Sequence, residues 1–98
     1  MSLFNTSEAT EEKEITTQLA AFSNVRIEKI VSCGQQSDWY CQEEDEWVCL
    51  LEGNAELLYE NGERQALLKG ESVFISRGKR HRVSHTSKPC VWLCVFAK

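Results

Sequence analysis

The chain has 98 residues, enough for one small domain and too few for a second hydrophobic core. Hydrophobic residues make up 42% and charged residues 27% of it, a composition typical of globular proteins. The net charge of −4 argues against nucleic acid or an anionic membrane as the main partner. No apolar run approaches the roughly 18 residues of a membrane span, so no membrane partner is expected.

The N-terminal stretch is polar and acidic, unlike a signal peptide. We therefore expect a cytoplasmic location and reduced thiols. The thiols contain no C-x-x-C pair, so their spacing favours small buried hydrophobic residues over a structural zinc site. The five cysteines are Cys33, Cys41, Cys49, Cys90 and Cys94.

Residues 1–24 are predicted to form a lead-in and a short helix. A threonine that can cap a helix is followed by two glutamates, which the positive end of a helix dipole favours. Ile15, Leu19 and Phe22 then recur at spacings of four and three residues, which places them on one helical stripe. This pattern predicts a helix over 10–21.

From Val25 onward, the period of the apolar residues changes to two, which is typical of strands. Asn61-Gly62 is a strong signal for a two-residue hairpin, because both positions tolerate positive φ. Seven short strands with turns between them indicate an all-β antiparallel sandwich or barrel over 25–98. The predicted strands are 25–31, 46–52, 55–60, 64–69, 72–76, 81–86 and 90–97.

Two groups of polar residues are candidates for a site. Gln42, Glu44 and Glu46 alternate onto one strand face, and Glu46 enters the apolar stretch that follows. A buried carboxylate needs a cation, a metal or a hydrogen-bond donor. His81 and His85 lie four residues apart in a predicted strand, so we expect them to share a face. Together these residues favour a binding site over a purely solvated acidic loop.

A basic cluster precedes and overlaps the histidine strand. It is either a solvated turn or a partner for the acidic residues at 43–46. Four cations in an acidic domain make nucleic-acid binding the weaker interpretation. The chain carries no local nucleophile signature and no glycine-rich phosphate loop. The cluster consists of Arg77, Lys79, Arg80 and Arg82.

Two stretches resemble the sequence motifs of a known family. In the first motif a glutamate is followed, after six residues, by a glycine, as Glu46 is by Gly53. The second motif runs glycine, proline, glycine, histidine and asparagine at fixed spacing. Its positions here are held by Gly70, Ser76, Gly78, His81 and His85. Over about 25–97 the chain thus resembles a small single-domain cupin, which implies a jelly-roll (double-stranded β-helix) barrel.

The resemblance implies a divalent metal, manganese, iron, nickel or zinc, held by Glu46 and His81. The family's other two histidine ligands are absent: their positions hold Tyr40 and Gln42 on one spacing, or Trp39 and Cys41 on the other. The oxygen of Gln42 and a ring nitrogen of His85 are the candidate replacements.

These observations leave several functions open. The first is a pocket that binds a metal and a small polar molecule, with Tyr40, Phe74 and Trp92 contacting the ligand. As an enzyme it would be a metal-assisted isomerase, dioxygenase or lyase. The alternative is a metal-free cupin that binds or senses a small ligand. A homodimer that buries Trp92 or Trp47 between two chains is compatible with either function.

Overall fold

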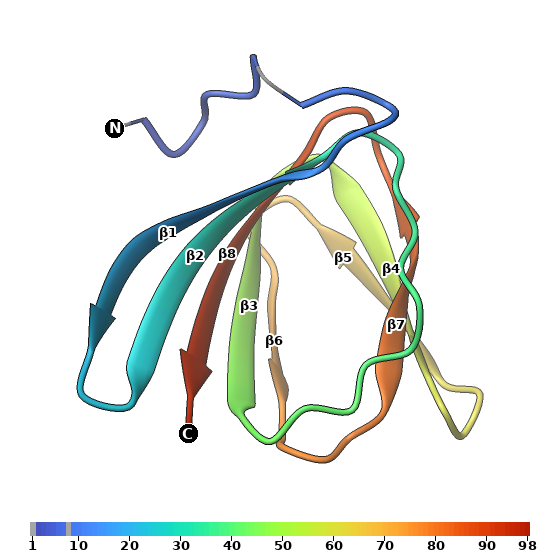
Figure 1. Cartoon of the computed structure of the whole chain (residues 1–98). Coiled ribbons are helices and arrows are strands. Elements are labelled where there is room, and N and C mark those ends of the chain that lie inside the picture. Colours follow the sequence, from blue (N-terminus) through green and yellow to red (C-terminus); the bar gives the residue numbers. More distant parts are fainter. Residues whose placement is uncertain (1, 8) are drawn as a thin grey trace.

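The computed structural model describes residues 2–7 and 9–98, so the predicted lead-in at Met1 and Glu8 lies outside the described residues. Eight strands form two antiparallel sheets, ordered β1-β2-β8-β3-β6 and β5-β4-β7 (Figure 1). The all-β prediction is confirmed. The described residues include no helix long and apolar enough to cross a membrane. The strands are β1 (Ile15–Phe22), β2 (Val25–Ser32), β3 (Asp45–Glu52), β4 (Asn54–Tyr59), β5 (Arg64–Leu68), β6 (Ser72–Ile75), β7 (His81–Thr86) and β8 (Cys90–Ala97).

The predicted N-terminal helix is wrong, because its second half forms β1. The strand pairs with β2 in a hairpin that turns through Ser23, whose φ is +51°. The pairing register shifts between Gln18 and Ala20, which marks a β-bulge at Leu19. A bulge breaks strict two-residue alternation, and this explains the helix-like spacing of the apolar residues. The β-branched run Ile15-Thr16-Thr17 also favours a strand.

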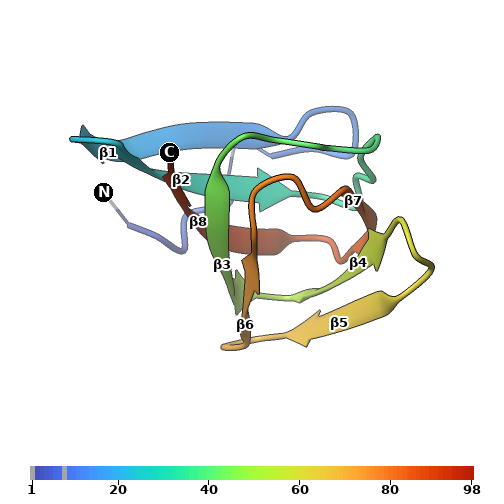
Figure 2. The ribbon, with the colours of Figure 1, turned by 90° about the horizontal axis from the view of Figure 1, so that it is seen from below.

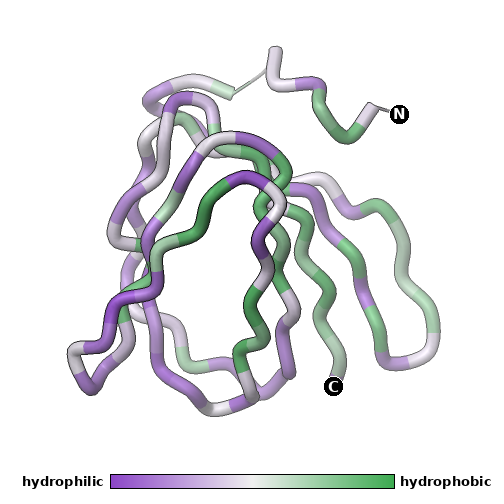
Figure 3. The backbone as a smooth tube through the Cα atoms, turned by 180° about the vertical axis from the view of Figure 1, so that it is seen from behind, coloured by the Kyte–Doolittle hydropathy of each residue, from purple (hydrophilic) through white to green (hydrophobic). Residues whose placement is uncertain are grey.

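The two sheets face each other across the barrel, as the view from below shows (Figure 2). Their facing side chains form a hydrophobic core that includes Val48, Leu50, Leu57 and Ile75. The chain is apolar along most of the length of β8, the central strand of the larger sheet (Figure 3). β8 therefore contributes apolar side chains to both faces of that sheet.

The connection from β2 to β3 runs along the free edge of β7. Tyr40 and His81 exchange two main-chain hydrogen bonds, of 2.7 and 3.0 Å, and the Ser37 amide donates to the Val83 carbonyl at 2.9 Å. These bonds satisfy main-chain groups that an exposed strand edge would leave unpaired. They also fix Tyr40 beside the first residue of β7, and the Gln42 carbonyl accepts a hydrogen bond from the Gly78 amide at 2.9 Å.

Candidate functional site

A cavity of about 250 Å³ lies inside the barrel. It is lined by inward side chains of β2, β3, β7 and β8 and by the β2–β3 connection. Its volume is just below the range of roughly 300–1,000 Å³ that is usual for ligand pockets, so it suits only a small molecule. Tyr40 is half-exposed at the lining, whereas Trp92 is buried.

Glu46 and His81 face each other in this cavity. Glu46 Oε1 lies 3.8 Å from His81 Nε2, and the Gln42 amide donates to the same oxygen at 2.9 Å. His81 Nδ1 lies 2.9 Å from the Lys79 carbonyl oxygen, which can only accept, so Nδ1 carries a proton. In the neutral imidazole this leaves the Nε2 lone pair directed at the site.

Burial raises the pKa of Glu46, and the Gln42 hydrogen bond and the charges of His81 and Arg26 offset part of that effect. The side chain of Glu46 is only 12% exposed. Desolvation disfavours a charged carboxylate, so the site keeps a proton on Glu46 to higher pH than water would. A carboxylic acid donates a hydrogen bond and a carboxylate accepts one, which gives Glu46 two modes of contact with a ligand.

Arg26 is the guanidinium that lines the cavity, and it is already paired. Its Nε donates to Glu28 at 3.0 Å, and Nη1 donates to Glu44. The guanidinium also lies 4.0 Å from the centre of the Phe96 ring. The hydrogen bond to Glu44, followed by the one to Glu28, raises the pKa of Arg26 above its usual range, although burial offsets part of the effect. Glu44 is therefore a buried partner of Arg26 and not a solvated residue.

A chain of hydrogen bonds lines the opposite part of the cavity. Trp92 Nε1 donates to Ser32 Oγ at 3.3 Å, and Ser32 Oγ donates to Glu14 at 2.5 Å. Glu14, Glu28 and Glu46 therefore give the cavity three carboxyl groups, and only Glu28 accepts a hydrogen bond from the guanidinium. The lining is rich in hydrogen-bond acceptors.

Most of the predicted site residues lie together. The structure places Tyr40, Gln42, Glu46, His81 and Trp92 around one cavity.

The prediction that His85 shares the face of His81 is wrong. Glu56 pairs with His85 but Leu57 pairs with Val83, so Ser84 is the extra residue of a β-bulge. The bulge shifts the alternation by one residue and places His85 on the opposite face of β7 from His81. His85 is exposed, and its Nε2 lies 3.1 Å from Asn54 Oδ1. It cannot replace a missing ligand at Glu46.

The prediction that Phe74 contacts a ligand in the cavity is also wrong. In the β3–β6 pairing Ile75 lies opposite Glu46 and faces the cavity. Phe74 therefore points to the other side of the sheet, where it is 61% exposed.

The residues present do not complete a metal site. Among the described residues, no three His, Cys, Asp or Glu side chains converge as a metal would require. Glu46 and His81 are the two strong donors, and the amide nitrogen of Gln42, which cannot coordinate, points to Glu46. Tetrahedral zinc sites normally use three or four protein ligands.

Residues 30–96 match the family profile described as Cupin domain. The chain belongs to the cupin domain family. It is 31% identical to a protein from Ralstonia eutropha JMP134 named "putative mannose-6-phosphate isomerase". That match has a TM-score of 0.92 and covers 100% of this cupin and 96% of the other chain.

Two further solved structures share the cupin fold at lower identity. A protein of unknown function from Streptococcus pyogenes is 20% identical with a TM-score of 0.81, covering 100% of this chain and 85% of the other. A cupin superfamily protein from Desulfitobacterium hafniense DCB-2 is 18% identical with a TM-score of 0.82, covering 92% and 82%. A comparison with curated proteins gives no match.

Several residues of the cupin cavity were not predicted from the sequence. Arg26, Glu28 and Ser32 share one face of β2, and their two-residue spacing with Ile30 was a usable signal. Glu14 had no such signal, because it lies within the segment that was predicted to be helical.

Proposed function

We propose that this cupin binds a small hydroxylated molecule, neutral or cationic, in the barrel without a resident metal. The observation that carries the proposal is the surplus of carboxyl groups in the cavity, from Glu14, Glu28 and Glu46, against one guanidinium that is already paired. Carboxylates accept hydrogen bonds, so the matching ligand presents hydroxyl or ammonium donors. Trp92 and Phe96 supply apolar surface beside these acceptors.

Glu46 and His81 are the proposed contact point for one ligand hydroxyl. When the imidazole of His81 is neutral, its Nε2 lone pair accepts a proton or a hydrogen bond, and Glu46 accepts or donates according to its own protonation. The raised pKa of Glu46, caused chiefly by burial, brings the carboxyl group closer to a range useful for proton transfer. The pair is thus the acid–base group of the site.

The name of the Ralstonia protein refers to a phosphorylated sugar, and this cavity favours the unphosphorylated form. A phosphate group is bound by free cations or main-chain amides. Arg26 is committed to two carboxylates. Lys79 lies 4.1 Å from the Tyr59 ring centre and is not part of the cavity lining. A phosphate would therefore meet uncompensated negative charge.

The test is isothermal titration of the metal-stripped protein with D-mannose, myo-inositol, glycerol and mannose 6-phosphate. We expect an unphosphorylated compound to bind and mannose 6-phosphate to bind more weakly than mannose. Glu46→Gln and His81→Asn should weaken binding by about tenfold or more, the effect of losing a hydrogen bond to a charged group. His85→Asn is the matched control, since His85 is exposed on the other face of the same strand, and should leave affinity unchanged.

Metal binding by Glu46 and His81 stays a prediction, and the same preparation tests it. Protein purified without a histidine tag is analysed for metal content and titrated with manganese, iron, nickel and zinc salts. A stoichiometric metal that is lost in His81→Ala would overturn the metal-free proposal. So would tighter binding of mannose 6-phosphate than of mannose, or no binding of any of the four compounds.

A further inference from the structure

The cavity has a polar group at each of two ends and a mainly apolar wall between them. The strand pairing places Glu46 opposite Phe96 and Ser32 opposite Cys90, so the two ends lie six residues apart along β8. At the usual rise per residue this is about 20 Å between Cα positions. The apolar wall between the two ends consists of Ile30, Val48, Leu57, Val83 and Trp92.

At the first end, His81 directs an unpartnered ring nitrogen into the cavity. The side chain of His81 is only 5% exposed, and its Nδ1 is paired with the Lys79 carbonyl oxygen. Nε2 lies 3.8 Å from Glu46 Oε1, beyond hydrogen-bonding distance, and it forms no hydrogen bond with any described residue. Buried polar atoms normally have a partner, so this end is suited to the ligand hydroxyl of the proposed function.

At the second end, two successive hydrogen bonds make Glu14 an acceptor. The indole N–H of Trp92 can only donate, so it occupies a lone pair of the Ser32 hydroxyl. Ser32 then donates its one proton to Glu14 Oε2 at 2.5 Å. The other oxygen of this carboxyl group receives no hydrogen bond from the described residues, and Glu14 is exposed. A ligand in the cavity can therefore reach a free acceptor oxygen here.

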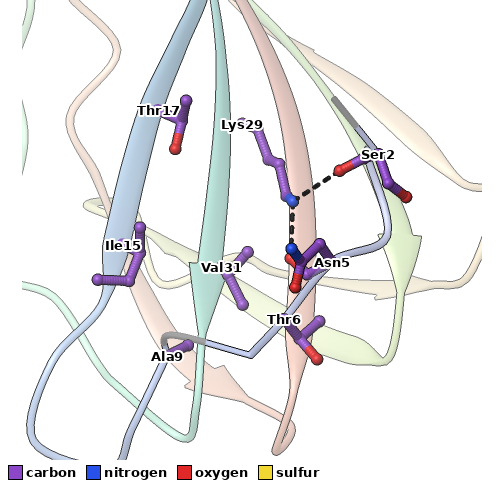
Figure 4. Close-up of a pocket in the computed structure, with 8 residues that line it drawn as sticks. All are labelled: Ser2, Asn5, Thr6, Ala9, Ile15, Thr17, Lys29 and Val31. Atoms are coloured by element: carbon purple, nitrogen blue, oxygen red, sulfur yellow. Dashed lines mark hydrogen bonds between the residues drawn. The ribbon is translucent and has the colours of Figure 1, made fainter.

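The chain supplies no cation to this second end. Among the described residues, no lysine or arginine forms a salt bridge with Glu14. Arg26, the guanidinium of the lining, is held by two other carboxylates. Lys29 points to the outer side of β2, where its Nζ donates to two carbonyl oxygens of the N-terminal segment, at 3.1 and 2.7 Å (Figure 4). A ligand that brings its own ammonium group would complete the pair.

We infer that the ligand is a linear amino alcohol, with its hydroxyl group at Glu46 and His81, its ammonium group at Glu14 and its methylene chain along the apolar wall. The inference rests on the proposed function, which places the hydroxyl group, and adds the other end of the ligand. The charge in the middle of the cavity has the matching sign. Burial raises the pKa of the Cys94 thiol, and the charges of three cavity glutamates raise it further. The same negative field stabilises a cationic ligand.

The separation of the two ends sets the length of the ligand. Of the roughly 20 Å between Cα positions, a hydrogen bond takes about 3 Å at each end and the side chains take a further 2–3 Å each, which leaves about 8–10 Å. An extended chain advances about 1.25 Å per bond, so six carbons between nitrogen and oxygen span about 9 Å. 2-Aminoethanol is too short to contact both ends, and the cavity of about 250 Å³ excludes much longer chains.

NMR titration of the metal-stripped, ¹⁵N-labelled protein at pH 7 with linear amino alcohols of two to eight carbons tests the inference. The diols of equal length, which lack the ammonium group, are the reference ligands. We expect the affinity for amino alcohols to rise with length to a maximum near six carbons. The six-carbon compound should bind about fivefold more tightly than its diol, the upper range for an ion pair with an exposed carboxylate.

Three variants separate the two ends of the cavity. Glu14→Gln keeps an acceptor for the Ser32 hydroxyl but removes the charge, so the preference for the amino alcohol over the diol should disappear. Glu46→Gln should weaken both compounds by about tenfold, because both place a hydroxyl group there. Glu12→Gln is the matched charge control: Glu12 is exposed, does not line the cavity and should leave both affinities unchanged. Circular dichroism confirms that each variant folds.

Three results would overturn the inference and leave the proposed function standing. The first is equal affinity for the amino alcohol and the diol of the same length. The second is an affinity that does not depend on chain length. The third is a preference for the amino alcohol that survives Glu14→Gln, or that Glu12→Gln abolishes equally. If neither amino alcohols nor diols bind, the proposed function fails together with the inference.

Discussion

Replacing Gly53 by alanine should destabilise the fold more than the same change at any glycine in an open turn. Gly53 joins β3 to β4 with φ of +85°, a conformation that costs other residues about 1–2 kcal/mol. A Cβ at this position would lie 2.1 Å from Ser87 Oγ and 2.6 Å from the Pro89 carbonyl oxygen. Both distances are far below van der Waals contact, so the neighbours would have to move.

Moving Ser87 has its own cost. Its Oγ accepts a hydrogen bond from the Asn54 amide at 2.9 Å and donates one to the Pro89 carbonyl at 2.8 Å. Each lost hydrogen bond removes about 1 kcal/mol. Together with the backbone strain, Gly53→Ala should lower the free energy of unfolding by about 3–4 kcal/mol, a large part of the total stability of a domain of this size.

Gly62→Ala is the control, because Gly62 has φ of +91° and no neighbouring atom within 4 Å of the added Cβ. It should lose only the backbone term of about 1–2 kcal/mol. Urea denaturation of the three proteins measures both free energies, and unchanged slopes show that the unfolded state is unaffected. Equal losses of stability in the two variants, within about 0.5 kcal/mol, would refute this prediction. They would show that the short distances from the added Cβ to Ser87 and Pro89 carry no cost in free energy.

Two further predictions concern ionisable side chains. Burial raises the pKa of Glu46, so ionisation of this carboxyl group destabilises the folded state once the pH exceeds its pKa in the unfolded chain. Glu46→Gln removes the ionisable group, so it should raise Tm at pH 7 and change it little at pH 4. Thermal melts across pH measure this, and a lower Tm for the variant at pH 7 would contradict it. Burial raises the pKa of Cys90 to about 12 and that of Cys94 well above its usual value, whereas Cys41 is exposed. Iodoacetamide at pH 8 should therefore alkylate Cys41 first and leave the two buried thiols unmodified until the protein unfolds. Peptide mass spectrometry measures the order of labelling, and early labelling of Cys94 would contradict the prediction.

The sequence was sufficient to predict those parts of the fold that depend on short-range patterns. The turn at Asn61-Gly62 joins β4 and β5 where it was predicted, but the loop between Tyr59 and Glu63 has three residues in place of two, and Gly62 has a positive φ whereas Asn61 does not. The spacing from Glu46 to Gly53 matches the length of β3. The bulges could not be predicted in this way. Leu19 and Ser84 each shift the alternation by one residue, which produced a false helix in one case and a wrong orientation for His85 in the other.

The bulge at Ser84 depends on contacts between strands. Ser84 Oγ donates to the Glu56 carbonyl oxygen and to Glu56 Oε1, at 3.2 and 2.7 Å, and these bonds stabilise the extra residue. Glu56 lies on β4, remote in sequence, so only the pairing of β4 with β7 brings the groups together. Phe74 differs, because alternation with Ile75 was enough to place it on the outer face once Ile75 was assigned to the core.

Under the proposed function, Glu46 serves ligand binding and not the stability of the fold. Its side chain is largely buried, and His81 is the basic group within 4 Å of it among the described residues. Burial of a carboxylate without a fixed cation destabilises the fold at neutral pH, and a glutamine would fill the same space without that cost. A protein that keeps a destabilising group in a ligand-sized cavity is expected to use it. If Glu46→Gln raises the stability of the protein and lowers its affinity for the ligand, Glu46 is a binding residue. If Glu46 has a structural role, the same substitution should lower the stability of the protein.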